Sequence, residues 1–241
     1  MSTTRLLIEY DGTDYSGWAK QTGLRTIQHE IETALATIAR KPLTLTVAGR
    51  TDAGVHARAQ VASYTGEPLD PIGLNSLLPP DIAIVKSELA EDGFDARRDA
   101  VSRTYCYRLL VRRERSALER RFATHWYYPF DRGALDACAE AIVGTHDFTA
   151  FTPTETQHKL FTRSIYDARW EGGDTGMLEF WIRGKTFMRQ QNRVLVGTML
   201  QVAIGNRSFE NFSALLEGAQ REDAGPTAPA RGLHLHSVEY S

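Results

Sequence analysis

The chain has 241 residues, of which 42% are hydrophobic and 24% are charged, and its formal net charge is −2 at pH 7. These values describe an ordinary globular protein, and no apolar run approaches the ~20 residues that a membrane span requires. The length is sufficient for two small domains. Since the N-terminal residues contain no hydrophobic region of a signal peptide, we expect a cytoplasmic protein that does not associate with a membrane.

The first half of the chain shows patterns of both strands and helices. Strands are expected at residues 5–10, 43–48, 59–64 and 82–89. Helices are expected at residues 26–40 and 69–78. Thr26 can cap the first helix, and Pro79 should stop the second, because proline cannot continue a helix. The apolar residues of the first helix recur at helical spacing and should face the core: Ile27, Ile31, Ala34, Leu35 and Ile38.

The second half repeats this mixture of elements. Strands are expected at residues 103–111, 166–170, 177–183 and 233–240, and helices at residues 135–143, 190–203 and 209–217. A polar stretch at 153–162 has no clear period and is predicted to be a loop. In the helix at 190–203, four residues should point inward: Val194, Leu195, Thr198 and Val202.

The order strand–helix–strand–strand occurs in both halves, which favours an α+β fold made of two similar domains. Each domain should consist of an antiparallel sheet with helices on one face. The N-terminal domain is predicted to span residues 1–102 and the C-terminal domain residues 103–241.

The two cysteines, Cys106 and Cys138, form no C-x-x-C pair and have no histidine at metal-ligand spacing. A disulfide scaffold and a cysteine-based zinc site are therefore not expected. We expect both side chains to be buried as small hydrophobic groups.

Basic residues are concentrated in one segment. Arginine accounts for 23 of the 28 basic residues, and nine arginines lie between Arg97 and Arg121 against three acids, a local net charge of +6. Guanidinium groups bind phosphates through two hydrogen bonds and stack on bases, so the segment suits a nucleic-acid partner. A solvated, arginine-rich surface is the alternative interpretation.

The loop at residues 49–57 is the segment that best fits catalysis. It places Asp52 two residues after Arg50 and directly before Ala53 and Gly54, whose small size permits close approach of another molecule. His56 adds a titratable group. Two predicted strands flank the loop, and such loops often carry functional residues. Aspartate and glycine are also ordinary turn formers, which is the competing interpretation.

The same loop closely matches the G-R-T-D-A-G-V-H-A signature of the tRNA pseudouridine synthase A family, and nine consecutive matches are a specific signal. Other segments resemble the family's pattern in the same order, from Tyr10 to Tyr240. They include Y-D-G-T at 10–13, L-L-P-P-D-I at 77–82, F-D-A-R at 94–97, R-T-Y-C-Y at 103–107, H-D-F at 146–148 and the segments 187–200 and 228–233. The resemblance therefore covers essentially the whole chain.

This resemblance implies an isomerase that converts uridine to pseudouridine in the tRNA anticodon stem-loop, at positions 38, 39 and 40. The reaction breaks the C1′–N1 glycosidic bond, turns the uracil and forms a C1′–C5 bond, so it requires no cofactor and no metal. The resemblance also implies an active-site cleft between the two domains, and a homodimer that holds the tRNA across two subunits.

The resemblance assigns roles to four residues. Asp52 would be the essential carboxylate, acting as a nucleophile or a base toward the ribose. Because burial alone raises the pKa of a carboxylate, the ionised form needs a cationic partner, and Arg193 matches the family's partner. Tyr105 would stack on the target base and take part in proton transfer. Leu233 would close the other side of the uracil.

The remaining predicted contacts are to RNA. The resemblance also implies that Arg50 would fill the gap that the flipped nucleotide leaves in its helix. His56 is either a support for the loop or an RNA contact. The predicted RNA-binding residues of the basic segment are Arg97, Arg103, Arg108, Arg112 and Arg113.

Two rival functions fit single features of the sequence. Residues 9–13 are close to the D-x-D-G-T motif of Mg²⁺-dependent phosphotransfer enzymes, but Glu9 stands where that chemistry needs an aspartate nucleophile. A non-catalytic RNA-binding protein would use the arginine-rich segment, with Asp52 as a turn residue.

Overall fold

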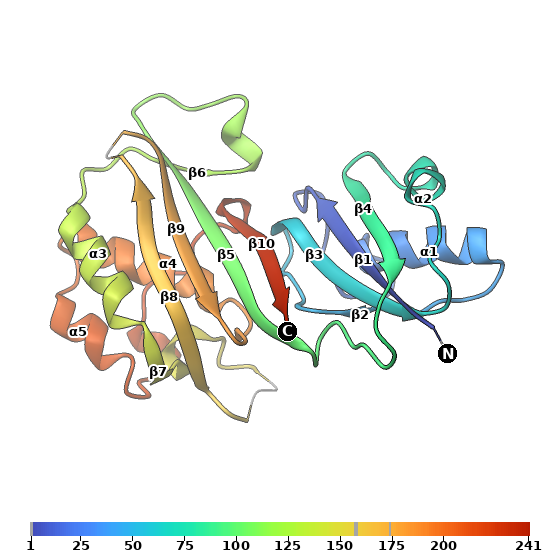
Figure 1. The fold of residues 1–241 in the computed structure, drawn as a ribbon. Coiled ribbons are helices and arrows are strands. Elements are labelled where there is room, and N and C mark those ends of the chain that lie inside the picture. The colour runs from blue at the N-terminus through green and yellow to red at the C-terminus, as the bar shows by residue number, and fades with distance from the viewer. Residues whose placement is uncertain (1, 157–158, 174) are drawn as a thin grey trace. The chain divides into compact units, whose positions relative to one another are not determined.

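The structure is a computed structural model that describes residues 2–156, 159–173 and 175–241. The chain forms two compact units, one made of Met1–Arg103 with His234–Ser241 and the other of Thr104–Leu233 (Figure 1). Both units combine β-strands with helices, which confirms the mixed α and β composition. None of the helices in the described part of the chain is long and apolar enough to cross a membrane.

The sheet of the first unit follows the order β4-β1-β3-β10. Its strands are β1 (Thr3–Tyr10), β3 (His56–Thr65), β4 (Ile82–Leu89) and β10 (Leu233–Tyr240), and the short β2 (Thr46–Val47) also pairs with β3. Strand β1 pairs antiparallel with both β3 and β4. Its even-numbered residues are buried and its odd-numbered ones are more exposed, so Tyr10 is the last inward side chain of the strand.

The C-terminal strand β10 belongs to the first unit, whereas the sequence grouped it with residues 103–241. His234 pairs with His56 and Leu235 with Ala57, and this pairing is parallel. The sheet is therefore mixed, whereas the sequence predicted a purely antiparallel sheet. An alternating pattern identifies a strand but does not specify which strand it joins, because that choice depends on contacts far apart in the chain.

Two helices complete the first unit. Helix α1 (Ile27–Ala39) buries Ile27, Ile31, Ala34 and Leu35 as predicted, but Ile38 is 37% exposed. Thr26 occupies the N-cap position with an extended backbone, yet its side chain makes no capping hydrogen bond. Helix α2 (Pro71–Leu77) is instead capped by Asp70, whose carboxylate accepts from the amides of Ile72 and Gly73.

The second unit has the strand order β5-β9-β8-β7, formed by β5 (Ala100–Val111), β9 (Gly176–Gly184), β8 (Thr162–Gly172) and β7 (Gly144–Asp147). Strand β6 (Thr124–Trp126) pairs in parallel with β5. The sequence analysis missed β6 and β7, which are too short to show a period. The predicted loop at 153–162 ends where β8 begins, and its residues 157–158 lie outside the described residues.

Three helices of the second unit pack together. Helix α3 (Arg132–Ala141) contacts β8 and also helices α4 (Gln191–Ala203) and α5 (Phe209–Ala214) (Figure 1). The four α4 residues predicted to point inward are all buried. Helix α5 is shorter than the predicted 209–217. Both cysteines are buried as expected, and burial raises the pKa of the Cys138 thiol to about 12.

Candidate active site

The loop that carries Asp52 joins β2 to β3 in the first unit. Asp52 is partly exposed, Arg50 is exposed, and His56 is buried as the first residue of β3. The turn after β1, the segment that follows this turn and three buried side chains hydrogen-bond to this loop.

The turn after β1 packs directly against the loop. Asp11 Oδ1 accepts hydrogen bonds from the amide and the hydroxyl of Thr13, which closes the turn. A Cβ atom on Gly12 would lie 1.9 Å from the carbonyl oxygen of Val55, so only glycine fits here. The D-G-T sequence therefore has a structural role as the turn that contacts the loop.

The following segment supports the loop from a second direction. The amide of Trp18 donates to the Thr51 carbonyl at 3.0 Å, and the amide of Gly54 donates to the Tyr15 carbonyl at 3.3 Å. Gly17 has a φ of 95°, and a Cβ atom there would meet the Thr51 carbonyl at 2.9 Å. These contacts hold the backbone on both sides of Asp52.

A buried polar group lies beneath the start of the loop. Gln60, which is fully buried on β3, donates from Nε2 to the Gly49 carbonyl at 2.7 Å and to the Tyr10 hydroxyl at 3.3 Å. The Tyr10 hydroxyl lies 2.7 Å from Thr51 Oγ1. Burial raises the pKa of Tyr10 to about 12, so this hydroxyl keeps its proton at neutral pH. Sequence reasoning missed Gln60 and Tyr10, although a glutamine within a mostly buried strand is a detectable signal.

Arg103 supports the residue at which the loop begins. Its Nε and Nη2 atoms donate to the Ala48 carbonyl at 3.2 and 2.7 Å, and the guanidinium also donates to the carbonyls of Ala100 and Arg97. The side chain is only 5% exposed. This burial does not fit the phosphate contact that the sequence suggested for Arg103.

His56 is packed inside the first unit. Its ring stacks on His234 with centroids 4.7 Å apart, and its Nδ1 accepts from the amide of Gly12 at 3.1 Å. Asp11 Oδ1 lies 3.2 Å from the same nitrogen. The hydrogen bond from the Gly12 amide makes Nδ1 the acceptor nitrogen of the ring in this arrangement. This geometry favours loop support over RNA contact for His56.

Three other predicted residues lie in the second unit. Tyr105 is buried on β5, with its ring edge-on to Phe187 at 5.2 Å. Arg193 lies in the first turn of α4, where its Nε donates to the Ala228 carbonyl at 2.8 Å. Leu233 is 6% exposed at the start of β10.

The segment before β10 contacts the elements that carry Arg193 and Tyr105. The Ala228 amide donates to the Arg193 carbonyl at 3.0 Å, and the Tyr107 hydroxyl donates to the Pro229 carbonyl at 2.9 Å. A Cβ atom on Gly232 would lie 2.6 Å from the Tyr107 ring. Residues 228–233 therefore lie against both the start of α4 and the strand that carries Tyr105.

The predicted RNA-binding arginines differ in their surroundings. Arg97, Arg112 and Arg113 are exposed. Arg108 is instead largely buried and forms ion pairs with Glu119 at 3.0 Å and Glu179 at 3.1 Å. The arginine-rich segment thus contains both exposed cations and cations that hold the protein together.

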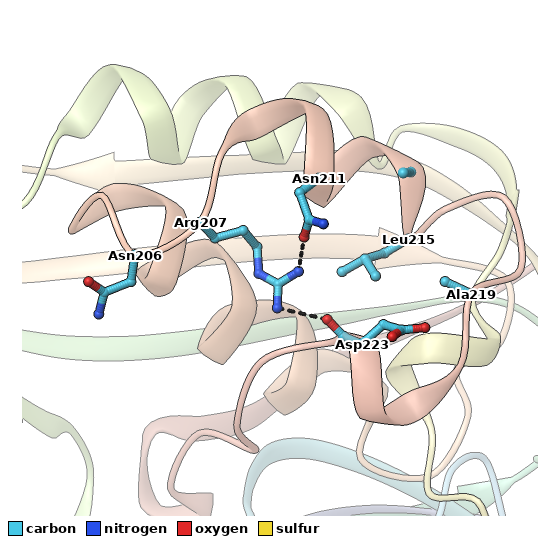
Figure 2. Close-up of a pocket in the computed structure, with 7 residues that line it drawn as sticks. Asn206, Arg207, Asn211, Leu215, Ala219 and Asp223 are labelled. Atoms are coloured by element: carbon cyan, nitrogen blue, oxygen red, sulfur yellow. Dashed lines mark hydrogen bonds between the residues drawn. The ribbon is translucent and has the colours of Figure 1, made fainter.

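A shallow hollow of about 470 Å³ lies in the second unit, and none of the residues predicted for the site lines it (Figure 2). Arg207 crosses it, donating to Asn211 Oδ1, to the Asp223 carbonyl and to Gln201 Oε1. Through these contacts the Arg207 guanidinium links α4, α5 and the segment after α5. Within residues 2–156, 159–173 and 175–241, no three or more His, Cys, Asp or Glu side chains gather as a metal site would require.

A mixed α and β protein with a carboxylate on a firmly held loop and exposed arginines fits the class of enzymes that act on nucleic acids. A family model described as tRNA pseudouridine synthase matches residues 138–241. Three curated relatives are named tRNA pseudouridine synthase A. The relative from Thermus thermophilus is 41% identical, and the match covers 98% of this chain and 95% of the relative. The relative from Myxococcus xanthus is 39% identical, with 100% and 92% covered. The relative from Bacillus pumilus is 37% identical, with 97% of both chains covered. The chain belongs to the tRNA pseudouridine synthase A family.

Proposed function

We propose that this chain isomerises uridine to pseudouridine in the anticodon stem-loop of tRNA, at positions 38, 39 and 40, with Asp52 as the essential carboxylate. Family membership supports the isomerase activity and the tRNA substrate. The loop around Asp52 supports the assignment of the carboxylate, because its backbone is hydrogen-bonded by Tyr15, Trp18 and the side chain of Gln60 while Asp52 itself remains partly exposed. A fixed carboxylate within reach of a substrate is what attack on a ribose carbon, or removal of its proton, requires.

Four further residues share the chemistry in this proposal. Arg193 is the cationic partner of Asp52, Tyr105 stacks on the uracil and takes part in proton transfer, and Leu233 covers the other face of the base. Arg50, exposed on the same loop as Asp52, fills the gap left by the flipped nucleotide. Because Asp52 belongs to one compact unit and Arg193, Tyr105 and Leu233 to the other, both units contribute to the reaction.

Fewer arginines are assigned to phosphate contacts than the sequence predicted. We assign phosphate contacts to the exposed Arg97, Arg112 and Arg113. Arg103 and Arg108 are assigned to the protein's own structure, because carbonyls and carboxylates already surround their guanidinium groups. The enzyme is proposed to work as a homodimer in the cytoplasm, as the family resemblance implies.

The proposal is tested by tritium release. Unmodified tRNA transcript labelled with tritium at C5 of uridine is incubated with the purified protein, without added metal or cofactor. Formation of the C1′–C5 bond displaces the C5 hydrogen, so tritium should appear in water. No release from any anticodon-arm uridine would refute the proposed reaction. If tritium is released, the uridines that remain unmodified show by exclusion which position is the target.

The salt dependence of tRNA binding tests the exposed arginines. Each phosphate contact removed should lower the slope of log affinity against log salt concentration by about 0.7–0.9. We expect Arg113→Gln to show this loss when tRNA affinity is measured by filter binding at several salt concentrations.

Arg169→Gln in the second unit is the matched control for that measurement. Arg169 is also exposed, but it already pairs with Asp167 and Glu171. Equal slopes for wild type and Arg113→Gln would remove Arg113 from the tRNA surface.

A further inference from the structure

We propose that Tyr10 and Gln60 are positioning residues that fix the loop of Asp52 for catalysis. Neither side chain is expected to reach the substrate, since Tyr10 is 3% exposed and Gln60 is fully buried. The inference rests on the proposed role of Asp52. It adds to that role a buried hydrogen-bond relay, defined here as Gln60, Tyr10 and Thr51.

The direction of the hydrogen bonds in the relay follows from what each group can donate. An amide nitrogen of glutamine has two protons and accepts none, so Gln60 Nε2 must be the donor to both the Gly49 carbonyl and the Tyr10 hydroxyl. The Tyr10 oxygen accepts the hydrogen bond from Gln60 and can donate its own proton to Thr51 Oγ1, 2.7 Å away. The carbonyl oxygen of the Gln60 side chain, Oε1, accepts a hydrogen bond from the amide of Val61 at 3.2 Å. The hydrogen bonds of the Gln60 amide therefore have a defined direction, and either hydroxyl can donate in the contact between Tyr10 and Thr51.

The relay reaches the loop at two points that flank Arg50. One is the Gly49 carbonyl, and the other is the Thr51 side chain, which is directly followed by Asp52. The Thr51 carbonyl is held separately by the amide of Trp18. With Thr51 fixed through both its side chain and its carbonyl, the position from which the Asp52 side chain extends is set by the strands beneath it.

Such a relay is not needed for burial alone. An apolar side chain at position 60 would fill the same interior without any requirement for partners, whereas a buried amide must find acceptors in fixed places. A polar relay therefore specifies where the loop lies. Because misplacing a reacting group by about 1 Å can lower a rate by about 100-fold, this specification has a direct effect on catalysis.

Tyr10→Phe tests the inference by removing one oxygen atom from the relay. We expect kcat for tritium release to fall by about 10–100-fold, while KM for tRNA changes less than about threefold. Amide hydrogen exchange at Gly54 and Val55, measured by mass spectrometry of loop peptides, should become faster than in wild type.

The matched control is Tyr64→Phe. Tyr64 lies on β3, as Gln60 does, and is 3% exposed like Tyr10, and its hydroxyl donates to the Glu67 carbonyl at 2.9 Å. The variant therefore loses a partly buried hydrogen bond of a buried tyrosine in the same unit, away from the loop. We expect Tyr64→Phe to retain kcat and the wild-type exchange of the loop.

A second pair of variants decides the question if Tyr10→Phe does not fold. Thr51→Val keeps the shape of the side chain but loses the hydroxyl, and Thr51→Ser keeps the hydroxyl. We expect kcat to fall in Thr51→Val and to be largely retained in Thr51→Ser. In the double variant Tyr10→Phe/Thr51→Val the losses should not add, because both changes break the same contact.

Three results would overturn the inference: a kcat of Tyr10→Phe within twofold of wild type, a change confined to KM, or an equal loss in Tyr64→Phe. Failure of the proposed function looks different, since wild type itself would then release no tritium. In that case the exchange rates of the loop in Tyr10→Phe and Tyr64→Phe still decide whether the relay positions Asp52.

Discussion

Asp52→Asn is expected to lower the rate of tritium release from C5-labelled tRNA by at least about 10³-fold, the scale on which loss of a single essential group acts in other enzymes. Asparagine has nearly the same shape as aspartate, but its amide is neither a nucleophile nor a base. The hydrogen bond from the Val55 amide to residue 52 uses the backbone carbonyl and is retained in the variant. The loop should therefore stay folded, and the affinity for tRNA should change little.

Asp92→Asn is the control for charge. Asp92 is an exposed acid in the same unit, so this variant changes the net charge by the same amount without touching the loop. Its activity should equal that of wild type. A parallel loss of tRNA binding and activity in Asp52→Asn would instead favour the RNA-binding interpretation, in which Asp52 is a structural turn residue. Activity that survives in Asp52→Asn would leave the reaction in place but remove Asp52 from it.

The elements that the sequence predicted well are those whose pattern is local. Strand β4 has the predicted bounds, and helices α1 and α4 begin and end within a residue of the predicted positions. In these segments the apolar residues recur with the period of the element, and burial of that face stabilises it. The candidate loop could be found in the same way, because its chemistry lies in consecutive residues.

What the sequence could not specify depends on distant contacts. Only pairing with β3 places β10 in the first unit. Arginines look alike in a sequence, but Arg103 folds inward onto the Ala48 carbonyl while Arg113 stays exposed. The Tyr10–Gln60 contact joins residues 50 positions apart, on strands whose register is set by the whole sheet. The residues that bring a loop into position are therefore harder to predict than the loop itself.

Gly12→Ala is expected to lower both stability and activity. Its Cβ atom would lie 1.9 Å from the Val55 carbonyl oxygen, and real Cβ atoms do not come closer than 3.0 Å, so the turn and the loop must separate by about 1 Å. Overpacking of this kind costs about 1–3 kcal/mol. For a chain of this length each kcal/mol lowers Tm by about 2–4 °C, which differential scanning calorimetry can measure.

The same separation should reduce activity more than stability alone explains. The Gly12 amide would move away from His56 Nδ1, and the displaced Val55 is hydrogen-bonded to the Asp52 carbonyl. Gly73→Ala is the control, because a Cβ atom on this residue of helix α2 makes an ordinary 3.6 Å contact with the Ile38 side chain, and alanine favours a helix by about 1 kcal/mol over glycine. We expect Gly73→Ala to keep kcat and to keep or raise Tm. If Gly12→Ala also keeps kcat, contact with the D-G-T turn does not determine where Asp52 lies, and the relay and Arg103 would have to position the loop without it.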